Sequence, residues 1–150
     1  MIALIQRVRE AEVRVGSERV AAIGRGVLAL IGVQRGDCVE AGARLLERIL
    51  SYRVFPDAEG RMNVSLREVR GGLLLVPQFT LAADTSKGMR PSFSSALAPE
   101  AARGLFDHLL GRARALHPEV ASGRFGEHMQ VSLTNEGPVT FWLRVSPARS

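Results

Sequence analysis

Short runs of hydrophobic residues, some alternating with polar ones, fill the first third of the chain. Alternation is typical of a strand with one buried face, and a short continuous apolar run is typical of a strand buried on both faces. The segments GSE and GRG lie between the later runs and favour turns. The expected strands are IALIQRV (2–8), AEVRV (11–15), RVAAI (19–23) and VLALIGV (27–33). The pattern therefore predicts three or four strands before any helix.

Hydrophobic residues recur at helical spacing in two later segments. The first begins after Asp37, with Glu40 three residues on as in a capping box, and continues to about Ser51. The second begins near Pro99, because proline is favoured in the first turn of a helix, and stops at the His-Pro pair 117–118. The apolar positions are Val39, Ala43, Leu46, Ile49 and Leu50 in the first and Ala102, Leu105, Phe106, Leu109, Ala113 and Leu116 in the second.

The remaining patterned segments again predict extended structure. They are YRVF (52–55), MNVSL (62–66), LLLVPQFTL (73–81), MQVSLT (129–134) and VTFWLRV (139–145). NEGPVT (135–140) lies between the last two and predicts a hairpin turn, since Asn, Gly and Pro favour turns. Strands outnumber helices. We expect an α/β fold, a single domain over residues 1–150 with a mixed, curved or two-layered β-sheet and two main helices.

The composition is that of an ordinary globular chain. At 150 residues it is long enough to bury about two thirds of the surface that its unfolded form exposes. The apolar runs are far shorter than the roughly 20 residues that span a bilayer, and the first residues lack a signal-peptide layout. A single cysteine, Cys38, fits a reducing compartment. We expect a cytoplasmic protein without membrane association, disordered only over SPARS (146–150).

Arginine dominates the charge of the chain. The formal net charge is +5 and the pI is near 10.9, with Lys87 as the only lysine. The guanidinium fork binds phosphate through paired hydrogen bonds, so this balance favours anionic partners such as RNA or nucleotides. The arginines are scattered along the sequence, so charge alone does not identify the partner.

Common cofactor and catalytic motifs are missing or out of place. GRGVLALIG (24–32) has the glycine spacing of a dinucleotide-binding motif, but a strand follows where that motif needs a helix. His108, His117 and His128 lack the spacing of a zinc site, and no Ser-His-Asp triad or G-x-S-x-G elbow can be assembled. Thr80 is the hydroxyl most worth considering, but no base for it is evident. We predict no metal and no cofactor.

Three stretches in a particular order and spacing resemble the D-aminoacyl-tRNA deacylase family. They are QFTL (78–81), GRFGEHMQVSL (123–133) and NEGPVT (135–140). IQRV (5–8), MNVSL and ADTSKGMRPSFS (83–94) extend the similarity over nearly the whole chain. The resemblance implies hydrolysis of the ester between a D-amino acid, or glycine, and the terminal adenosine of tRNA, with L-aminoacyl-tRNA spared. It also implies a homodimer with active sites at the subunit interface, and aminoacyl-tRNA rather than DNA as partner.

The resemblance further implies roles for particular residues in chiral selection. Gly137 and Pro138 would be joined by a cis bond and enter the pocket of the partner subunit. Their carbonyl oxygens would form a wall that leaves no volume for the Cα substituent of an L-residue, whereas a glycyl ester would pass. Arg7 would hydrogen-bond near this pair, and Phe125 and Met129 would help to shape the pocket.

For the chemistry, the resemblance points to Gln78, Phe79 and Thr80 as the catalytic segment. Their backbone N–H groups would stabilise the oxyanion, and the 2′-hydroxyl of the terminal ribose would assist proton transfer to or from the attacking water. We prefer this RNA-assisted route to Thr80 as a covalent nucleophile, because no base for Thr80 is visible.

One position departs from the family pattern, and two other functions stay open. The family usually has serine where this chain has Pro77, which offers neither a hydroxyl nor an N–H. We expect activity to survive, because the following residues are unchanged. A non-enzymatic RNA-binding module would bind tRNA without ester turnover. A general esterase using Thr80 or a serine would hydrolyse simple esters without tRNA.

Overall fold

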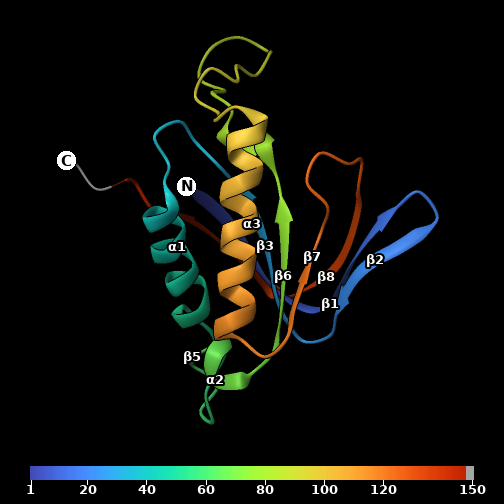
Figure 1. Cartoon of the computed structure of the whole chain (residues 1–150). Coiled ribbons are helices and arrows are strands. Elements are labelled where there is room, and N and C mark those ends of the chain that lie inside the picture. The colour runs from blue at the N-terminus through green and yellow to red at the C-terminus, as the bar shows by residue number, and fades with distance from the viewer. Residues whose placement is uncertain (148–150) are drawn as a thin grey trace.

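The computed structural model describes residues 1–147, and a six-stranded mixed sheet forms its centre (Figure 1). The strand order is β2-β1-β3-β6-β7, with β8 paired along the other edge of β1. β1 is antiparallel to β2, β3 and β8, whereas β3, β6 and β7 are mutually parallel. The strands are β1 (Ile2–Val15), β2 (Glu18–Ile23), β3 (Gly26–Gly32), β6 (Gly72–Pro77), β7 (Val120–Ser122) and β8 (Gln130–Arg144). The predicted mixed sheet is confirmed.

Two long helices, α1 (Val39–Ser51) and α3 (Pro99–Leu116), lie side by side over one face of the sheet (Figure 1). Their bounds agree with the apolar spacing of the sequence, and the prediction of two main helices is confirmed. Each helix buries the stripe that the spacing defines, with Leu46 on α1 and Phe106 on α3 fully enclosed. Pro99 occupies the first turn of α3, where its missing N–H leaves no bond unmade.

A short segment between α1 and β6 contains the remaining regular structure. β4 (Arg53–Pro56) and β5 (Met62–Ser65) form a separate two-stranded ribbon. One turn of helix, α2 (Leu66–Val69), follows and was not predicted. A capping box holds it, in which the Ser65 hydroxyl accepts from the Glu68 N–H and the Glu68 carboxylate accepts from the Ser65 N–H.

Alternate residues of the sheet face two separate apolar clusters. On one face Ile5, Ala29 and Leu75 pack beneath the two long helices. On the other face the second half of β1 folds over with β2 and the start of β8, so that Val13 meets Leu28 in a smaller cluster. The smaller cluster consists of Val8, Ala11, Val13, Ala21, Ile23, Leu28, Leu74 and Val76. The sheet is therefore strongly curved, as expected.

Several of the predicted extended segments differ from the structure. The segments 2–8 and 11–15 are one continuous strand, β1, so three strands precede α1. LLLVPQFTL is extended only to Pro77, and Phe79–Ala82 form a 3₁₀ helix, η1. The extended prediction is wrong beyond Pro77 because a continuous apolar run does not distinguish a strand from a short buried helix.

NEGPVT does not form a hairpin turn. Both flanking segments pair with β1 in the same antiparallel direction, so the chain does not reverse and the two segments are halves of β8. Asn135 lies opposite Val8 and Thr140 lies opposite Gln6, which sets residues 136–139 against Arg7 alone. These residues form a wide interruption of the ladder, called the Gly-Pro bulge below. The hairpin prediction is wrong because the same residue types favour turns and bulges.

The predicted disorder of SPARS concerns residues that lie mostly outside the described part of the chain. Within it, the Ser146 carbonyl accepts a hydrogen bond from Arg44 Nη2 at 2.6 Å. Residues 148–150 are not described. Over residues 1–147, none of the helices combines the length and apolar character needed to cross a bilayer.

Candidate active site

A cavity of about 570 Å³ opens where the parallel strands β3 and β6 end. Ligand sites in α/β sheets commonly lie beyond the carboxyl ends of parallel strands. β3 supplies Ile31, the segment after β6 supplies Phe79, and α3 supplies Phe106. Arg35 is the one charged residue among the described residues of the lining. These are Ile31, Val33, Arg35, Pro77, Gln78, Phe79, Phe93, Ala96, Leu97, Ala98, Pro99, Ala102, Phe106, Phe125 and Gly126.

The backbone beside this cavity presents two unpaired N–H groups. A helix start leaves its first N–H groups without intrahelical acceptors, and η1 begins at Phe79. The N–H groups of Phe79 and Thr80 accordingly form no hydrogen bond within residues 1–147. The Gln78 N–H, in contrast, donates to the Ile31 carbonyl at 2.7 Å. The Gln78 N–H thus continues the ladder between β6 and β3, and the free backbone donors of this segment are those of Phe79 and Thr80.

The hydroxyl of Thr80 has an amide partner rather than a base. Gln78 Nε2 donates a hydrogen bond to Thr80 Oγ1. Histidine and carboxylate side chains are absent from the described lining of the cavity. The arrangement thus offers hydrogen-bond donors to a developing negative charge but no group that would deprotonate Thr80.

Aromatic rings form much of the remaining cavity surface. The rings of Phe79 and Phe93 lie 5.2 Å apart between centroids, and those of Phe106 and Phe125 lie 6.4 Å apart. Phe79 is 61% exposed and Phe93 is 41% exposed, so their faces are free to receive another ring. Phe125 also lines the cavity, as the resemblance implies, and the guanidinium carbon of Arg103 lies over its ring at 5.2 Å from the centroid.

Pro77 fits the end of β6 without a lost ladder bond. The Leu75 carbonyl faces β7 and accepts from the Gly123 N–H, whereas the Gln78 N–H faces β3. Directions alternate along a strand, so the missing N–H of Pro77 faces the β7 side. β7 already ends at Ser122, opposite Leu75, so no acceptor is left unpaired there.

The Gly-Pro bulge is the second region that the resemblance singled out. The peptide bond between Gly137 and Pro138 is cis, and Gly137 has a φ of +146°. Arg7 holds the bulge as expected, since its Nε donates to the Glu136 carbonyl at 2.8 Å. Its Nη1 donates to the Val54 carbonyl at 2.7 Å, which ties the bulge to β4.

Asn135 closes the bulge and was missed by sequence reasoning. Its Oδ1 accepts from the Val139 N–H at 2.7 Å, and its Nδ2 donates to the Val139 carbonyl at 3.1 Å and to Thr140 Oγ1 at 2.9 Å. One side chain therefore replaces the ladder bonds that the bulge interrupts. The position of Asn at the first residue of NEGPVT was the available signal, because Asn commonly bonds to backbone a few residues on.

The bulge and the cavity lie at opposite ends of the sheet. Val8, beside the bulge, pairs with Gly26 at the start of β3, whereas Pro77, beside the cavity, pairs with Ile31 near its end. Five residues of strand at about 3.3 Å each place these positions roughly 17 Å apart. A single chain therefore does not bring the bulge to the two free N–H groups.

The other residues considered from sequence take structural positions. Met129 is absent from the described lining of the cavity and packs in the smaller apolar cluster, where its Sδ lies 3.3 Å from the Arg124 nitrogen. His117 is buried, with Nε2 2.6 Å from the Gly71 carbonyl oxygen, while His108 and His128 are exposed. Within residues 1–147, no three His, Cys, Asp or Glu side chains gather to hold a metal ion.

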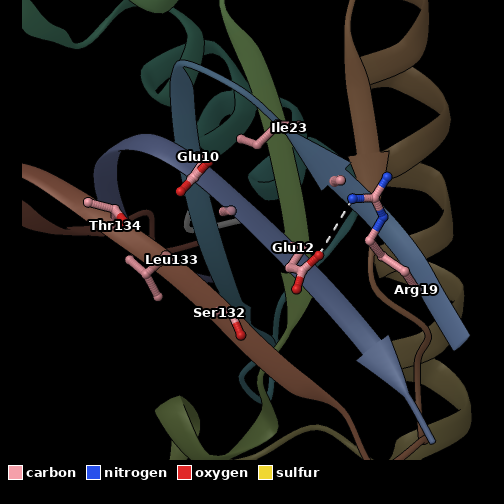
Figure 2. Close-up of a pocket in the computed structure, with 9 residues that line it drawn as sticks. Glu10, Glu12, Arg19, Ile23, Ser132, Leu133 and Thr134 are labelled. Atoms are coloured by element: carbon pink, nitrogen blue, oxygen red, sulfur yellow. Dashed lines mark ion pairs between the residues drawn. The ribbon is translucent and has the colours of Figure 1, made fainter. Parts of the chain in front are cut away.

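A separate hollow of about 350 Å³ lies over β1, β2 and β8 (Figure 2). Glu10, Glu12 and Arg19 line it together with two hydroxyl side chains of β8. Glu12 lies 3.7 Å from Arg19 and 3.3 Å from Arg14, so its charge is already compensated. None of the residues singled out from the sequence lines this hollow, and the candidate site stays at the end of β3 and β6.

Free backbone donors at an aromatic cavity without a side-chain base are the arrangement expected of a hydrolase that stabilises an oxyanion. The family model described as D-Tyr-tRNA(Tyr) deacylase matches residues 4–144. A D-aminoacyl-tRNA deacylase of Thioalkalivibrio sulfidiphilus is 66% identical, over 99% of this chain and 100% of its own. One of Methylococcus capsulatus is 60% identical, over 99% and 97%. The chain belongs to the D-Tyr-tRNA(Tyr) deacylase family, and the predicted family and hydrolase class are confirmed.

Two solved structures share the fold over nearly their whole length. The c-Myc DNA Unwinding Element Binding Protein has a TM-score of 0.93 at 38% identity, over 99% of this chain and 100% of its own. A probable eukaryotic D-amino acid tRNA deacylase has a TM-score of 0.81 at 20% identity, over 95% and 97%. The second likeness shows the fold alone.

Proposed function

We propose that the protein hydrolyses the ester bond of D-aminoacyl-tRNA, and of glycyl-tRNA, in the cytoplasm, releasing tRNA and the free amino acid. Membership of the deacylase family supports the reaction class. The observation that carries the proposal is the pair of free N–H groups, on Phe79 and Thr80, beside an aromatic cavity. The faces of Phe79 and Phe93 offer stacking surfaces for the terminal adenine, because every base presents a π-face.

The reaction needs few protein groups. A water oxygen attacks the ester carbonyl carbon, and the N–H groups of Phe79 and Thr80 stabilise the oxyanion that forms. The bond from carbon to the ribose oxygen then breaks, and that oxygen takes up the proton that the water loses. The neighbouring 2′-hydroxyl carries this proton, because the described cavity lining holds no histidine or carboxylate. Loss of one oxyanion donor typically lowers kcat by about 10² to 10³.

Chiral selection takes place across a homodimer. The roughly 17 Å between bulge and cavity within one chain supports an arrangement in which the bulge of each subunit enters the cavity of the other. There the carbonyl oxygens of the bulge exclude an L-substituent by volume, so selection does not depend on the identity of the D-residue. Backbone atoms keep their positions whatever side chain the substrate carries.

An exposed apolar surface supports the dimer. Trp142 is 55% exposed, and it pairs in register with Leu4, which pairs in turn with Leu30. These three cross-strand neighbours lie on the face of the sheet that the helices leave uncovered. Trp142→Asp is expected to leave the chain folded, to shift the mass in sedimentation from dimer to monomer and to lower the ratio of D- to L-ester hydrolysis. A monomer that still hydrolysed only the D-ester would exclude selection across the interface.

The direct test compares hydrolysis of D- and L-tyrosyl-tRNA by the purified protein and by Gly137→Ala. A Cβ on Gly137 would lie 2.7 Å from Val139 Cγ2 and 3.2 Å from Arg7 Nη2, so the bulge must move. We expect rapid loss of the D-ester only, with reduced discrimination in the variant. Gly111→Ala, where nothing lies within 4 Å, is the matched control. Equal hydrolysis of both esters by the unmodified protein would refute exclusion.

Thr80→Ala separates the enzymatic alternatives. The variant keeps the backbone N–H, so kcat on D-tyrosyl-tRNA is expected to fall less than about tenfold. A loss of about 10³-fold or more, with turnover of simple esters by the unmodified protein, would favour an esterase with Thr80 as nucleophile. Binding of tRNA without turnover of either ester would favour an RNA-binding module.

A further inference from the structure

A third cavity, of about 390 Å³, lies beside the Gly-Pro bulge and carries an excess of positive charge. Its lining combines three guanidinium groups with one carboxylate. The residues are Arg7, Val8, Arg9, Arg25, Phe55, Pro56 and Glu136. We propose that this cavity, called the arginine pocket below, binds a backbone phosphate of the tRNA substrate through Arg9 and Arg25. The inference rests on the proposed function, since it assigns a further contact to the same substrate.

The two arginines named are not occupied by the protein itself. Arg9 and Arg25 are exposed, and neither forms an ion pair or a side-chain hydrogen bond within residues 1–147. Arg7 differs, because its Nε and Nη1 already donate to backbone carbonyls. Other surface guanidinium groups form ion pairs with carboxylates, as Arg67 does with Glu47 at 3.0 Å. The pocket thus holds cationic donors without an internal acceptor.

Arg25 is also oriented in advance. Its guanidinium carbon lies 5.0 Å from the centroid of the Phe55 ring, and that ring is fully buried. Stacking of this kind restrains the guanidinium plane while its N–H edge stays available. The Arg25 carbonyl accepts from the Gly72 N–H at 2.9 Å, which anchors the backbone next to β6. A fixed planar fork suits a phosphate better than a flexible point charge does.

The position of the arginine pocket indicates which anion it binds. Glu136 belongs both to the pocket and to the bulge, and Arg7 bonds to its carbonyl. In the proposed dimer the bulge enters the partner's cavity, so the arginine pocket lies at the mouth of that cavity. The nucleoside that carries the ester is joined to the preceding nucleotide by a phosphodiester. A negative charge therefore enters with every aminoacyl-tRNA, at the side from which the bulge approaches.

The test measures binding of uncharged tRNA by fluorescence anisotropy over a salt series, for the full chain and for Arg9→Ala/Arg25→Ala. We expect about fivefold to tenfold weaker binding at low salt and a salt slope smaller by about 1. Arg112→Ala/Arg114→Ala removes the same charge from exposed positions of α3 and is expected to leave both values within about twofold of the wild type. Arg25→Lys keeps the charge and should fall between the wild type and the double variant.

Hydrolysis supplies the second readout. D-tyrosyl-adenosine lacks the phosphodiester, so the double variant should hydrolyse it at the wild-type rate while its KM for D-tyrosyl-tRNA rises. Equal loss on both substrates would indicate a structural role and overturn the proposal, as would unchanged tRNA binding. Binding of inorganic phosphate that the double variant loses, without any change in tRNA affinity, would assign the pocket to a free anion instead. A wild-type protein that binds tRNA but hydrolyses neither ester would contradict the proposed function. The tRNA affinities of the wild type and the double variant would then still decide whether the arginine pocket binds phosphate.

Discussion

Replacement of Asn135 by alanine should weaken both the fold and the chiral selection. The side chain supplies the hydrogen bonds that close the Gly-Pro bulge, and alanine can form none of them. The Val139 N–H then loses its acceptor at 2.7 Å, while the Val139 carbonyl and the Thr140 hydroxyl lose donors at 3.1 and 2.9 Å. Nothing else in the described chain bonds to that N–H.

The expected destabilisation follows from the burial of each partner. Val139 is 9% exposed, and a buried donor without a partner costs about 1–3 kcal/mol. Thr140 is exposed, so water replaces the amide there at little cost. The sum is a loss of about 1–3 kcal/mol in the free energy of unfolding. With an m-value of about 2 kcal/mol per molar urea, the midpoint of unfolding should fall by about 0.5–1.5 M.

Urea unfolding and the ratio of D- to L-ester hydrolysis are the two assays. Asn135→Asp keeps the acceptor for the buried Val139 N–H, so it should lose less than half as much stability as Asn135→Ala. Asn63→Ala is the matched control, since the Asn63 amide contacts only Asp57 in an exposed turn, and it should change stability by no more than about 0.5 kcal/mol. A wild-type urea midpoint for Asn135→Ala, or equal losses in the two Asn135 variants, would refute the reasoning.

Other positions give independent expectations. Gly26→Ala would place Cβ 1.9 Å from a backbone oxygen of β6, so it should lower the free energy of unfolding by about 3 kcal/mol or more in a thermal experiment. Gly24→Ala is the control, because nothing lies within 4 Å of its Cβ, and it should stay within about 0.5 kcal/mol of wild type. The Asn63 amide and neighbouring N–H groups lower the pKa of Asp57, so its contribution to stability is present above pH of about 4 and lost as pH falls through that lowered pKa. Asp57→Asn should therefore flatten the acid side of a stability profile from pH 3 to 7. Pro77→Ser should leave D-tyrosyl-tRNA hydrolysis within about threefold of wild type, because no N–H is missed there.

Local patterns were sufficient for the elements whose partners lie nearby. The apolar stripe of α1 and the proline in the first turn of α3 fix both helices, since a helix closes its own hydrogen bonds. The alternation along β1 predicted two strands rather than one, because Arg9 and Glu10 read as a polar break. Only the long β8 partner, more than 110 residues away in sequence, shows that β1 continues through them.

The same limit explains the errors at the site. The Gly-Pro bulge was taken for a hairpin because its residue types suit both, and the deciding fact is that both halves of β8 pair with β1. The engagement of the Gln78 N–H with Ile31 depends on how far β6 runs beside β3, which the apolar run LLLVP does not specify. Resemblance pointed to these segments, and the pairing of distant strands decided which of their atoms are free.

The proposed mechanism divides the site between two ends of the sheet, and this division has a physical rationale. A cavity with backbone donors and no acid or base stabilises the oxyanion of either a D- or an L-ester equally well, so it cannot select by its chemistry. Selection must then come from a rigid object placed against Cα. The bulge meets that need, because Arg7 and Asn135 both fix it through bonds to backbone groups and leave its exposed tip free. One chain holds the bulge roughly 17 Å from its own cavity, so discrimination between D- and L-esters is expected to require the dimer. The monomeric Trp142→Asp variant tests this, because a monomer that still discriminates would contradict it.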